Sequence, residues 1–555
     1  MANIEFAIRT FTTDTTGKIV VISGVSTVPT VAGVSVDSPT KVDVGIDGAG
    51  TVLDSSGNPG VEPALYSWKF STTGLTANTD YSFTVTQGSN SRSGTLRTQL
   101  SSSGEEDFSI FVVSCDHYSS GTDKGCYGYM HEFSLANNVK AIIHQDDHGY
   151  VDNLVYGNSS NPASPIWNTQ APESTPKAYG YACGYAAYLG LIDATGVTNN
   201  PTWATRFHDE DRIWCHTNIP MVVQVGDHEA LNNPEEGTAF TTAHYDKSKE
   251  AWLGTIGAGM PYLDTNFARG DVAGGGHLAF TANLGPIEAI SFDRVYGLTT
   301  GTLTYDDTSN ATEGQYASRA TAKATPVDTR WLGTTQVSDL TGAVDATSPF
   351  KMLVMTCGSR QMMTRARRIA LIDGGTWTNS AWLGAQQPLH DYTSVDATDS
   401  EWLELMSNSG GVCQKAQSYG GVVFGVHGDT HHTGMQYLYY PQDASNAAIS
   451  MYQFSCGSVC AETSQSLHPD IVEGYNYQGN HQQYLPDWID RTGTPSAGRN
   501  TCLRIDATKA SGDWVLTVNT LEVDDATNAA TVTDSRTLTH GTADNAPSHL
   551  RKGWA

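Results

Sequence analysis

Four groups of acidic, histidine and thiol side chains occur in this sequence, each at the end of a short apolar run. They are Cys115-Asp116-His117, Asp146-Asp147-His148 with Tyr150, Asp227-His228-Glu229, and His427 with Asp429, His431 and His432. Carboxylate, imidazole and thiolate together suit transition metals, whereas carboxylate and carbonyl oxygens alone would suit Ca²⁺ or Mg²⁺. A pair of such cations needs several anionic ligands, one of which bridges them. The four groups therefore indicate a metal site if folding brings them together.

Taken singly, each group has a commonplace explanation. An Asp-Asp-His sequence at the end of a strand is more often a turn or a helix cap. A lone histidine in a strand, such as His144, is more often a core residue. The joint pattern is more specific, and glycine precedes the aspartate in two groups, at Gly226 and Gly428. Glycine at these positions allows a tight turn directly after a strand.

The apolar runs that carry these groups predict buried strands within 108–117, 139–150, 219–233 and 420–432, and two further runs, 287–294 and 350–360, have the same form. The segments between them, such as 126–137 and 400–407, could form helices. Alternation of buried strands and helices predicts an α/β core. In open α/β sheets ligands bind beyond the carboxyl ends of the strands, so we expect the four groups to converge in one crevice.

The two ends of the chain differ from this part, because they predict strands without helices between them. Short strands are predicted before residue 100, at 18–22, 41–46, 66–70, 81–85 and 93–98, with Gly, Asn, Asp and Pro between them. This part resembles an immunoglobulin-like or fibronectin type III sandwich, and a short acidic linker follows it. Three more strands are predicted at 501–508, 514–523 and 530–540. We therefore expect a β-sandwich domain over 1–100 and an α/β domain that carries the four groups over 108–545.

Composition excludes several classes of protein. The chain has 555 residues and a net charge of −27, which disfavours binding to nucleic acids or anionic lipids. Its 12 Trp, 25 Tyr and 15 Phe residues argue against disorder. We expect no membrane span, because the longest apolar runs are far shorter than about 18 residues. The first residues do not have the pattern of a signal peptide, and the nine scattered cysteines do not predict a disulfide framework.

The four groups resemble, in order, the sequence blocks of the calcineurin-like metallophosphoesterases, and among these the PhoD-like alkaline phosphatases and phosphodiesterases. Residues 115–117 match the D-x-H block with Cys in the first position, and 144–150 resemble the block HxGDxxY. Residues 226–229, followed by Asn232 and Asn233, resemble DDHE-xx-N, and 428–431 resemble GDxH. Two supporting segments, 291–297 and 329–340, resemble the LDTRxY strand and the LGxxQxxWL helix of that family.

This resemblance implies a four-layer α/β sandwich that hydrolyses phosphate mono- or diesters with a metal-bound hydroxide at a dinuclear site. It implies Fe³⁺ with Ca²⁺ as the metal pair, with Zn²⁺, Mn²⁺ or Mg²⁺ as alternatives. The implied ligands of the first metal are Cys115, Asp147, Tyr150 and His431. Those of the second are Asp147, Asp227 and Asp429, with Asn232 or Asn233; we take Asn233.

Three further residues have implied roles in catalysis. His228 would donate a proton to the leaving alkoxide or stabilise its charge. Arg294 would bind phosphate oxygens as a fork, although a structural ion pair is as good an explanation. For His117 two roles stay open, a metal ligand or a hydrogen-bond partner of the nucleophile.

Other readings of the sequence compete with this one. The leading alternative is a structural or adhesion subunit of a larger assembly, such as a virion appendage, that carries a phosphatase-like fold. A nuclease on the same fold is disfavoured, because the sequence lacks a basic surface. We expect an extracellular, periplasmic or particle-associated location. A homo-oligomer, or an assembly partner that binds the N-terminal module, is compatible with the sequence.

Overall fold

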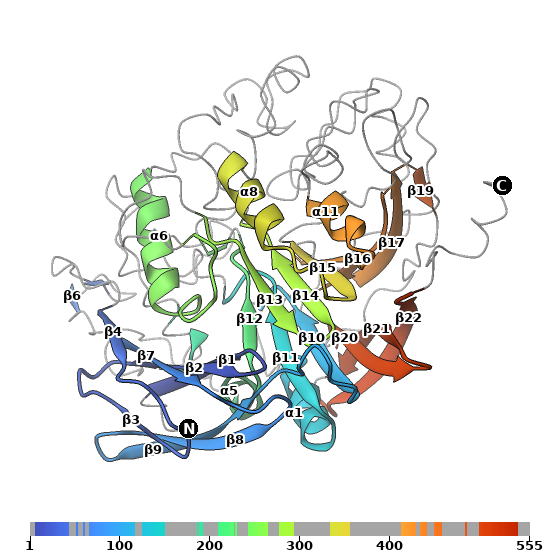
Figure 1. The fold of residues 1–555 in the computed structure, drawn as a ribbon. Coiled ribbons are helices and arrows are strands. Elements are labelled where there is room, and N and C mark those ends of the chain that lie inside the picture. The colour runs from blue at the N-terminus through green and yellow to red at the C-terminus, as the bar shows by residue number, and fades with distance from the viewer. Residues whose placement is uncertain are drawn as a thin grey trace, which may run out of the picture.

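The computed structural model describes residues 6–43, 52–53, 59–60, 66–116, 125–149, 185, 188–191, 209–226, 228–229, 242–264, 277–293, 333–355, 412–428, 433–440, 449–457, 483–485, 499–524 and 526–541. Figure 1 shows their arrangement, with two N-terminal sheets beneath two larger sheets. Within the described ranges, none of the helices combines the length and the hydropathy needed to cross a bilayer.

Two antiparallel sheets form the N-terminal part of the molecule. One has the order β1-β2-β7-β4, with strands β1 (Phe6–Thr12), β2 (Thr16–Ser23), β7 (Tyr66–Thr73) and β4 (Thr40–Asp43). The other has the order β3-β8-β9, with β3 (Thr30–Ala32), β8 (Asp80–Gln87) and β9 (Asn90–Arg97). A separate pair joins β5 (Val52–Leu53) and β6 (Pro59–Gly60). Trp68, Phe83 and Leu96 are buried between the β1-β2-β7-β4 sheet and the β3-β8-β9 sheet. These two N-terminal sheets therefore form the predicted β-sandwich.

The strands β1 and β2 are buried on both faces. Phe6 and Ile8 of β1 belong to the core of the sandwich, whereas Ala7 and Phe11 belong to the main core of the molecule. The side chains of a strand alternate between its two faces, so a single strand can supply both cores. The sequence pattern does not predict β1, because Arg9 and the threonines beside it interrupt the apolar run.

The first of the two large sheets has the order β12-β11-β10-β20-β21-β22. Its strands are β10 (Phe108–Val113), β11 (Val139–His144), β12 (Met221–Val223), β20 (Arg499–Ala510), β21 (Asp513–Asp524) and β22 (Ala529–Thr539). Strands β10, β11 and β12 are parallel, and the three C-terminal strands complete the sheet with antiparallel pairing. The predicted strands at 501–508, 514–523 and 530–540 coincide with β20, β21 and β22.

The second large sheet has the order β13-β14-β15-β16-β18-β17-β19. Its strands are β13 (Phe280–Leu284), β14 (Ile287–Ser291), β15 (Phe350–Met355), β16 (Val422–His427), β17 (Thr433–Tyr440), β18 (Ile449–Cys456) and β19 (Gln483–Leu485). Strands β14, β15, β16 and β18 are parallel. Residues from both large sheets, such as Phe111 and Phe424, share one core.

Some of the described helices lie on the outer faces of the large sheets (Figure 1). The described helices are α1 (Tyr127–Ala136), α5 (Glu210–Asn218), α6 (Thr242–Gly254), α8 (Gly333–Ala343) and α11 (Val412–Ser418). Phe111 of β10 packs edge-on against Tyr129 and Phe133 of α1, and α8 and α11 pack on β13 and β16. This arrangement confirms the predicted α/β fold class. The domain boundaries 1–100 and 108–545, and the immunoglobulin or fibronectin III type of the sandwich, stay predictions.

Helix α5 lies between the two parts of the molecule. It packs against α1 on one side and against β1 and β9 of the sandwich on the other. The Asp209 side chain caps its first turn and accepts hydrogen bonds from the backbone N–H groups of Asp211 and Arg212, at 2.6 and 3.2 Å. This cap fixes the start of the helix and with it the position of Arg212.

Candidate metal centre

The carboxyl ends of the parallel strands meet at one edge of the two large sheets. In the register of the first sheet, Val113 lies opposite His144, and His144 lies opposite Val223. An added Cβ at Gly226 would lie 2.6 Å from Asp146 Cβ, and one at Gly428 would overlap Ser114 Oγ and Asp146 Oδ1. Only glycine allows this approach, so the ends of β10, β11, β12 and β16 are in contact, as the sequence analysis expected.

A thiol and two carboxyl groups lie together at this edge. Ligand atoms of Cys115, Asp146 and Asp147 all lie within 4.8 Å of one another, and the three residues are buried. Ser114 Oγ donates a hydrogen bond to Asp146 Oδ1 at 2.5 Å. Burying several acidic groups beside one another is costly unless a cation neutralises them. A thiolate and carboxylates in contact therefore fit a metal ion, and the thiolate favours a transition metal.

The backbone at this cluster has an uncommon conformation. Cys115 has a φ of 53° and Asp147 a φ of 54°, in the left-handed region that residues with a side chain seldom adopt. Such residues cost about 1–3 kcal/mol each and persist only where the surroundings impose the conformation. The two turns brace each other, because Asp116 N–H donates to Asp147 O and Gly149 N–H donates to Asp116 O, both at 3.1 Å.

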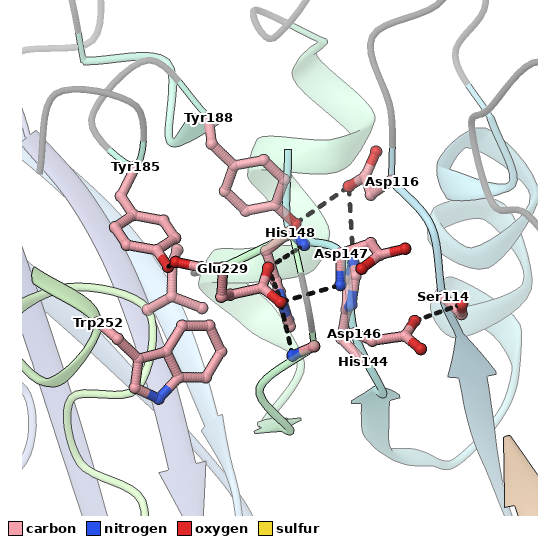
Figure 2. A network of polar contacts seen from close by, with 12 residues as sticks. Ser114, Asp116, His144, Asp146, Asp147, His148, Tyr185, Tyr188, Glu229 and Trp252 are labelled. Atoms are coloured by element: carbon pink, nitrogen blue, oxygen red, sulfur yellow. Dashed lines mark hydrogen bonds and ion pairs between the residues drawn. The ribbon is translucent and has the colours of Figure 1, made fainter. Parts of the chain in front are cut away.

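The Glu229 carboxylate holds the Asp147 turn from one side (Figure 2). It accepts hydrogen bonds from the backbone N–H groups of Gly226, at 2.6 Å, Asp147, at 3.2 Å, and His148, at 2.5 Å. The His148 ring nitrogen Nδ1 lies 3.2 Å from the same carboxylate. Glu229 is fully buried. One carboxylate therefore ties the loop after β11 to the loop after β12.

The Asp116 carboxylate holds the neighbouring turn from the other side. Its Oδ2 accepts hydrogen bonds from Tyr127 Oη at 2.7 Å, Arg212 Nη2 at 2.9 Å and Tyr188 Oη at 3.0 Å. His144 Nε2 lies 3.8 Å from the same oxygen. Burial alone would raise the pKa of Asp116, but the Arg212 guanidinium, with His144 and Tyr127, holds that pKa well below its usual range. Asp116 is therefore a carboxylate at neutral pH.

Two histidines are stacked behind the cluster. The rings of His144 and His148 lie 3.8 Å apart, and Trp252 packs edge-on against His148 with 5.1 Å between ring centres. Burial lowers the pKa of both imidazoles, and the Asp116 carboxylate offsets only part of this effect at His144. Both rings are neutral at pH 7, so they add no positive charge that would compete with a cation.

The structure brings together two of the ligands expected from the sequence, Cys115 and Asp147. The expected proton donor His228 is buried and precedes Glu229 in the loop after β12. The other expected site residues lie outside the described residues; these are His117, Tyr150, Asp227, Asn233, Arg294, Asp429 and His431.

Sequence reasoning missed several residues of this region. Asp116 and Glu229 were grouped with the metal-compatible residues, but their carboxylates accept hydrogen bonds from the protein. Asp146 was noted only as a departure from the family pattern, and it joins the donor cluster. Arg212 and Tyr188 were not singled out at all. No local signal could have found them, because each is one ordinary residue far from its partner in sequence.

Comparison with known proteins bears on the fold. No family model matches this sequence, and no curated protein matches it. Among solved structures, one of PhoD matches with a TM-score of 0.56 and 14% identity over 96% of this chain and 90% of that chain. The purple acid phosphatase PPD1 from yellow lupin (Lupinus luteus) seeds matches with a TM-score of 0.51 and 9% identity, over 96% of this chain and 73% of that chain. The chain therefore has the fold of these two phosphatases, as the resemblance in the sequence implied.

Proposed function

We propose that this chain hydrolyses phosphate esters of small molecules with the help of metal ions bound at the carboxyl edge of its two sheets. The observation that carries the proposal is the buried set of Cys115, Asp146 and Asp147, whose ligand atoms lie within 4.8 Å of one another. The set lies in a fold similar to two phosphatases. Either observation alone would be weak support, since folds host many functions.

Cys115 and Asp147 would hold the first metal, and the Asp147 carboxylate would be shared with the second. The expected ligands outside the described residues, Tyr150, Asp227, Asn233, Asp429 and His431, would complete the two sites. We propose Fe³⁺ with Ca²⁺ as the pair. When bound, the ions lower the pKa of a water molecule and offset the charge of the phosphate. A chain with a net charge of −27 needs this local positive field to admit an anionic ester.

His228 would transfer the proton to the leaving oxygen of the ester. Its side chain is buried, and the next residue, Glu229, binds the backbone of the Asp147 turn. The proton donor and the shared ligand are therefore anchored by one carboxylate, which keeps them in a fixed relation. Arg294 and His117 would contact the phosphate and the nucleophile.

The test measures metals and turnover on the same sample. Protein purified without chelator is analysed by mass spectrometry for metals and assayed with p-nitrophenyl phosphate and bis-p-nitrophenyl phosphate. We expect iron and a second metal near one each per chain. We expect Cys115→Ser and Asp147→Asn to lower turnover by at least about 100-fold, the range seen when a key electrostatic group of an active site is removed.

Cys215→Ser is the matched control, because Cys215 is also a buried thiol but lies on α5, where its Sγ contacts the Tyr127 carbonyl oxygen. It should retain metal and turnover. The proposal is wrong if the protein holds no stoichiometric metal and shows no turnover after iron and calcium are added. The better of the two substrates would separate a monoesterase from a diesterase.

A further inference from the structure

The left-handed conformation of Cys115 needs an external support, and the residue that follows it supplies one. We propose that Asp116, held by Arg212, is a positioning residue that keeps the Cys115 thiolate turned into the metal site. The inference rests on the proposed function in one respect, namely that Cys115 is a metal ligand. The inference gives the Asp116–Arg212 ion pair a role in the site, although neither residue would contact the metal or the substrate.

The backbone and the side chain of Asp116 are both fixed. Its N–H and C=O bond to Asp147 and Gly149, each at 3.1 Å, and form a parallel bridge with the loop after β11. Its side chain is 3% exposed and binds Arg212 and two tyrosines. Rotation of the peptide between Cys115 and Asp116 would break one of these sets of contacts. The strained φ of Cys115 is therefore imposed from its C-terminal side.

Arg212 is itself held in place. Its Nη1 donates to the Tyr188 carbonyl at 3.0 Å, and its guanidinium lies 3.9 Å from the centre of the Tyr188 ring. Burial lowers the pKa of Arg212, but the Asp116 carboxylate together with the hydroxyl groups of Tyr188 and Tyr127 more than offsets this and raises the pKa above its ordinary value. The pair thus joins α5, capped at Asp209, to the loop that carries Cys115.

A direct metal-ligand role for Asp116 fits the structure less well. All its side-chain contacts given above are at Oδ2, where three donors surround one oxygen. Its atoms do not belong to the set formed by Cys115, Asp146 and Asp147. Oδ2 is already surrounded by three donors and has little capacity left for a cation. Either carboxylate oxygen could have joined the set of ligand atoms, and neither does.

Co²⁺ binding provides the test, because a Co²⁺–thiolate bond gives a charge-transfer absorption that reports on Cys115 independently of turnover. Metal-free full-length protein is titrated with Co²⁺ and the absorption is recorded. We expect Asp116→Asn to weaken Co²⁺ binding by about 10- to 100-fold, the usual effect of removing a group that orients a metal ligand, and to reduce the thiolate band at saturation.

Asp116→Asn leaves Arg212 buried without its partner and could unfold the chain. The double variant Asp116→Asn/Arg212→Met removes that charge, and replacement of a buried pair by uncharged groups is often tolerated. It should fold and still bind Co²⁺ weakly. Glu288→Gln is the control, because Glu288 pairs with Lys351 in the core near the amino ends of the strands. It should bind Co²⁺ as the wild type does.

The outcomes separate the two proposals. If wild-type protein gives no thiolate band, or if Cys115→Ser gives the wild-type band, then Cys115 is not a ligand and the proposed function fails. If the wild type gives the band and the double variant gives it with unchanged affinity, Asp116 does not position Cys115 and the inference is overturned. An equal loss in Glu288→Gln would also overturn it, because the effect would then be one of general stability.

Discussion

Two buried ion pairs lie at opposite ends of the parallel strands. Asp116 and Arg212 meet at 2.9 Å beyond the carboxyl end of β10. Glu288 and Lys351 meet at 3.4 Å near the amino ends of β14 and β15, where they lie directly opposite each other in the register. Burial raises the pKa of Glu288, and Lys351 offsets only part of this effect. The pKa of Asp116, in contrast, is lowered.

The difference shows that burial alone does not decide how a charged pair behaves. The Glu288 pair joins neighbouring strands whose residues all have negative φ, and a single lysine is its charged partner. The Asp116 pair joins segments far apart in sequence and lies beside two residues with positive φ. Extra donors make the charged form of Asp116 stable, so that pair can hold a strained loop. The Glu288 pair also holds a loop, because Asp345 N–H donates to Glu288 and the Asp345 carbonyl accepts from Lys351, but no non-glycine residue of positive φ among those the structure describes lies beside it.

The largest effect on stability is expected from Arg212→Met. It leaves the Asp116 carboxylate buried without its cation, which costs about 3–5 kcal/mol. Chemical denaturation of the metal-free protein would measure the free energy of unfolding. A loss below about 1 kcal/mol would mean that the two tyrosines suffice, and the contrast between the pairs would disappear.

A smaller loss is expected from Arg9→Met. Arg9 reaches from β1 of the sandwich into the main core and donates to the Ile256 carbonyl, and burial lowers its pKa to about 10. Loss of a hydrogen bond from a charged group costs about 1.5–3 kcal/mol. The same denaturation assay would measure the change in the free energy of unfolding. A change near zero would show that Arg9 of the sandwich does not stabilise the core beneath the metal site.

The pH dependence of stability offers a third measurement. Burial lowers the pKa of His216 well below its ordinary value of 6.5, and Arg212 and Arg9 add to this effect. Below pH 6.5 the unfolded chain therefore binds a proton that the folded chain does not, and stability falls as the pH falls, by up to about 1.4 kcal/mol per pH unit. His216→Phe, which keeps an aromatic ring against Tyr127, should reduce this slope. If the pH dependence of stability is unchanged in His216→Phe, the lowered pKa of His216 is not its cause.

The smallest effect is expected from Glu288→Gln. Burial raises the pKa of Glu288, so its charge adds little stability, and the amide oxygen can still accept the hydrogen bond from Asp345 N–H. Lys351 loses its anion but keeps the hydrogen bonds from Nζ to the carbonyl oxygens of Asp345 and Ser348. We expect a loss of about 1 kcal/mol or less. A loss as large as that of Arg212→Met would show that the two pairs do not differ as described.

The sequence predicted the fold because the features that determine it are local. Apolar runs mark the strands, and the helix expected at 126–137 is α1 (Tyr127–Ala136). The contact between the carboxyl ends of β10, β11, β12 and β16 followed from a general rule of α/β sheets. The support around them did not follow, because Arg212 lies 96 positions from Asp116. The positive φ of Cys115 also escaped prediction, since no glycine marks the turn.

The pairing of β10 with β20 has a consequence for synthesis of the chain. Strand β10 lies in the middle of its sheet, and Ser109 Oγ donates to Asp506 Oδ1 across 397 positions of sequence. At roughly 5–20 residues per second, a ribosome needs roughly 20–80 s to make the intervening chain. During that time one edge of a strand that is buried throughout in the folded protein has no partner and can pair with another nascent chain. Expression yield should therefore depend on chaperones that shield this edge until β20 emerges.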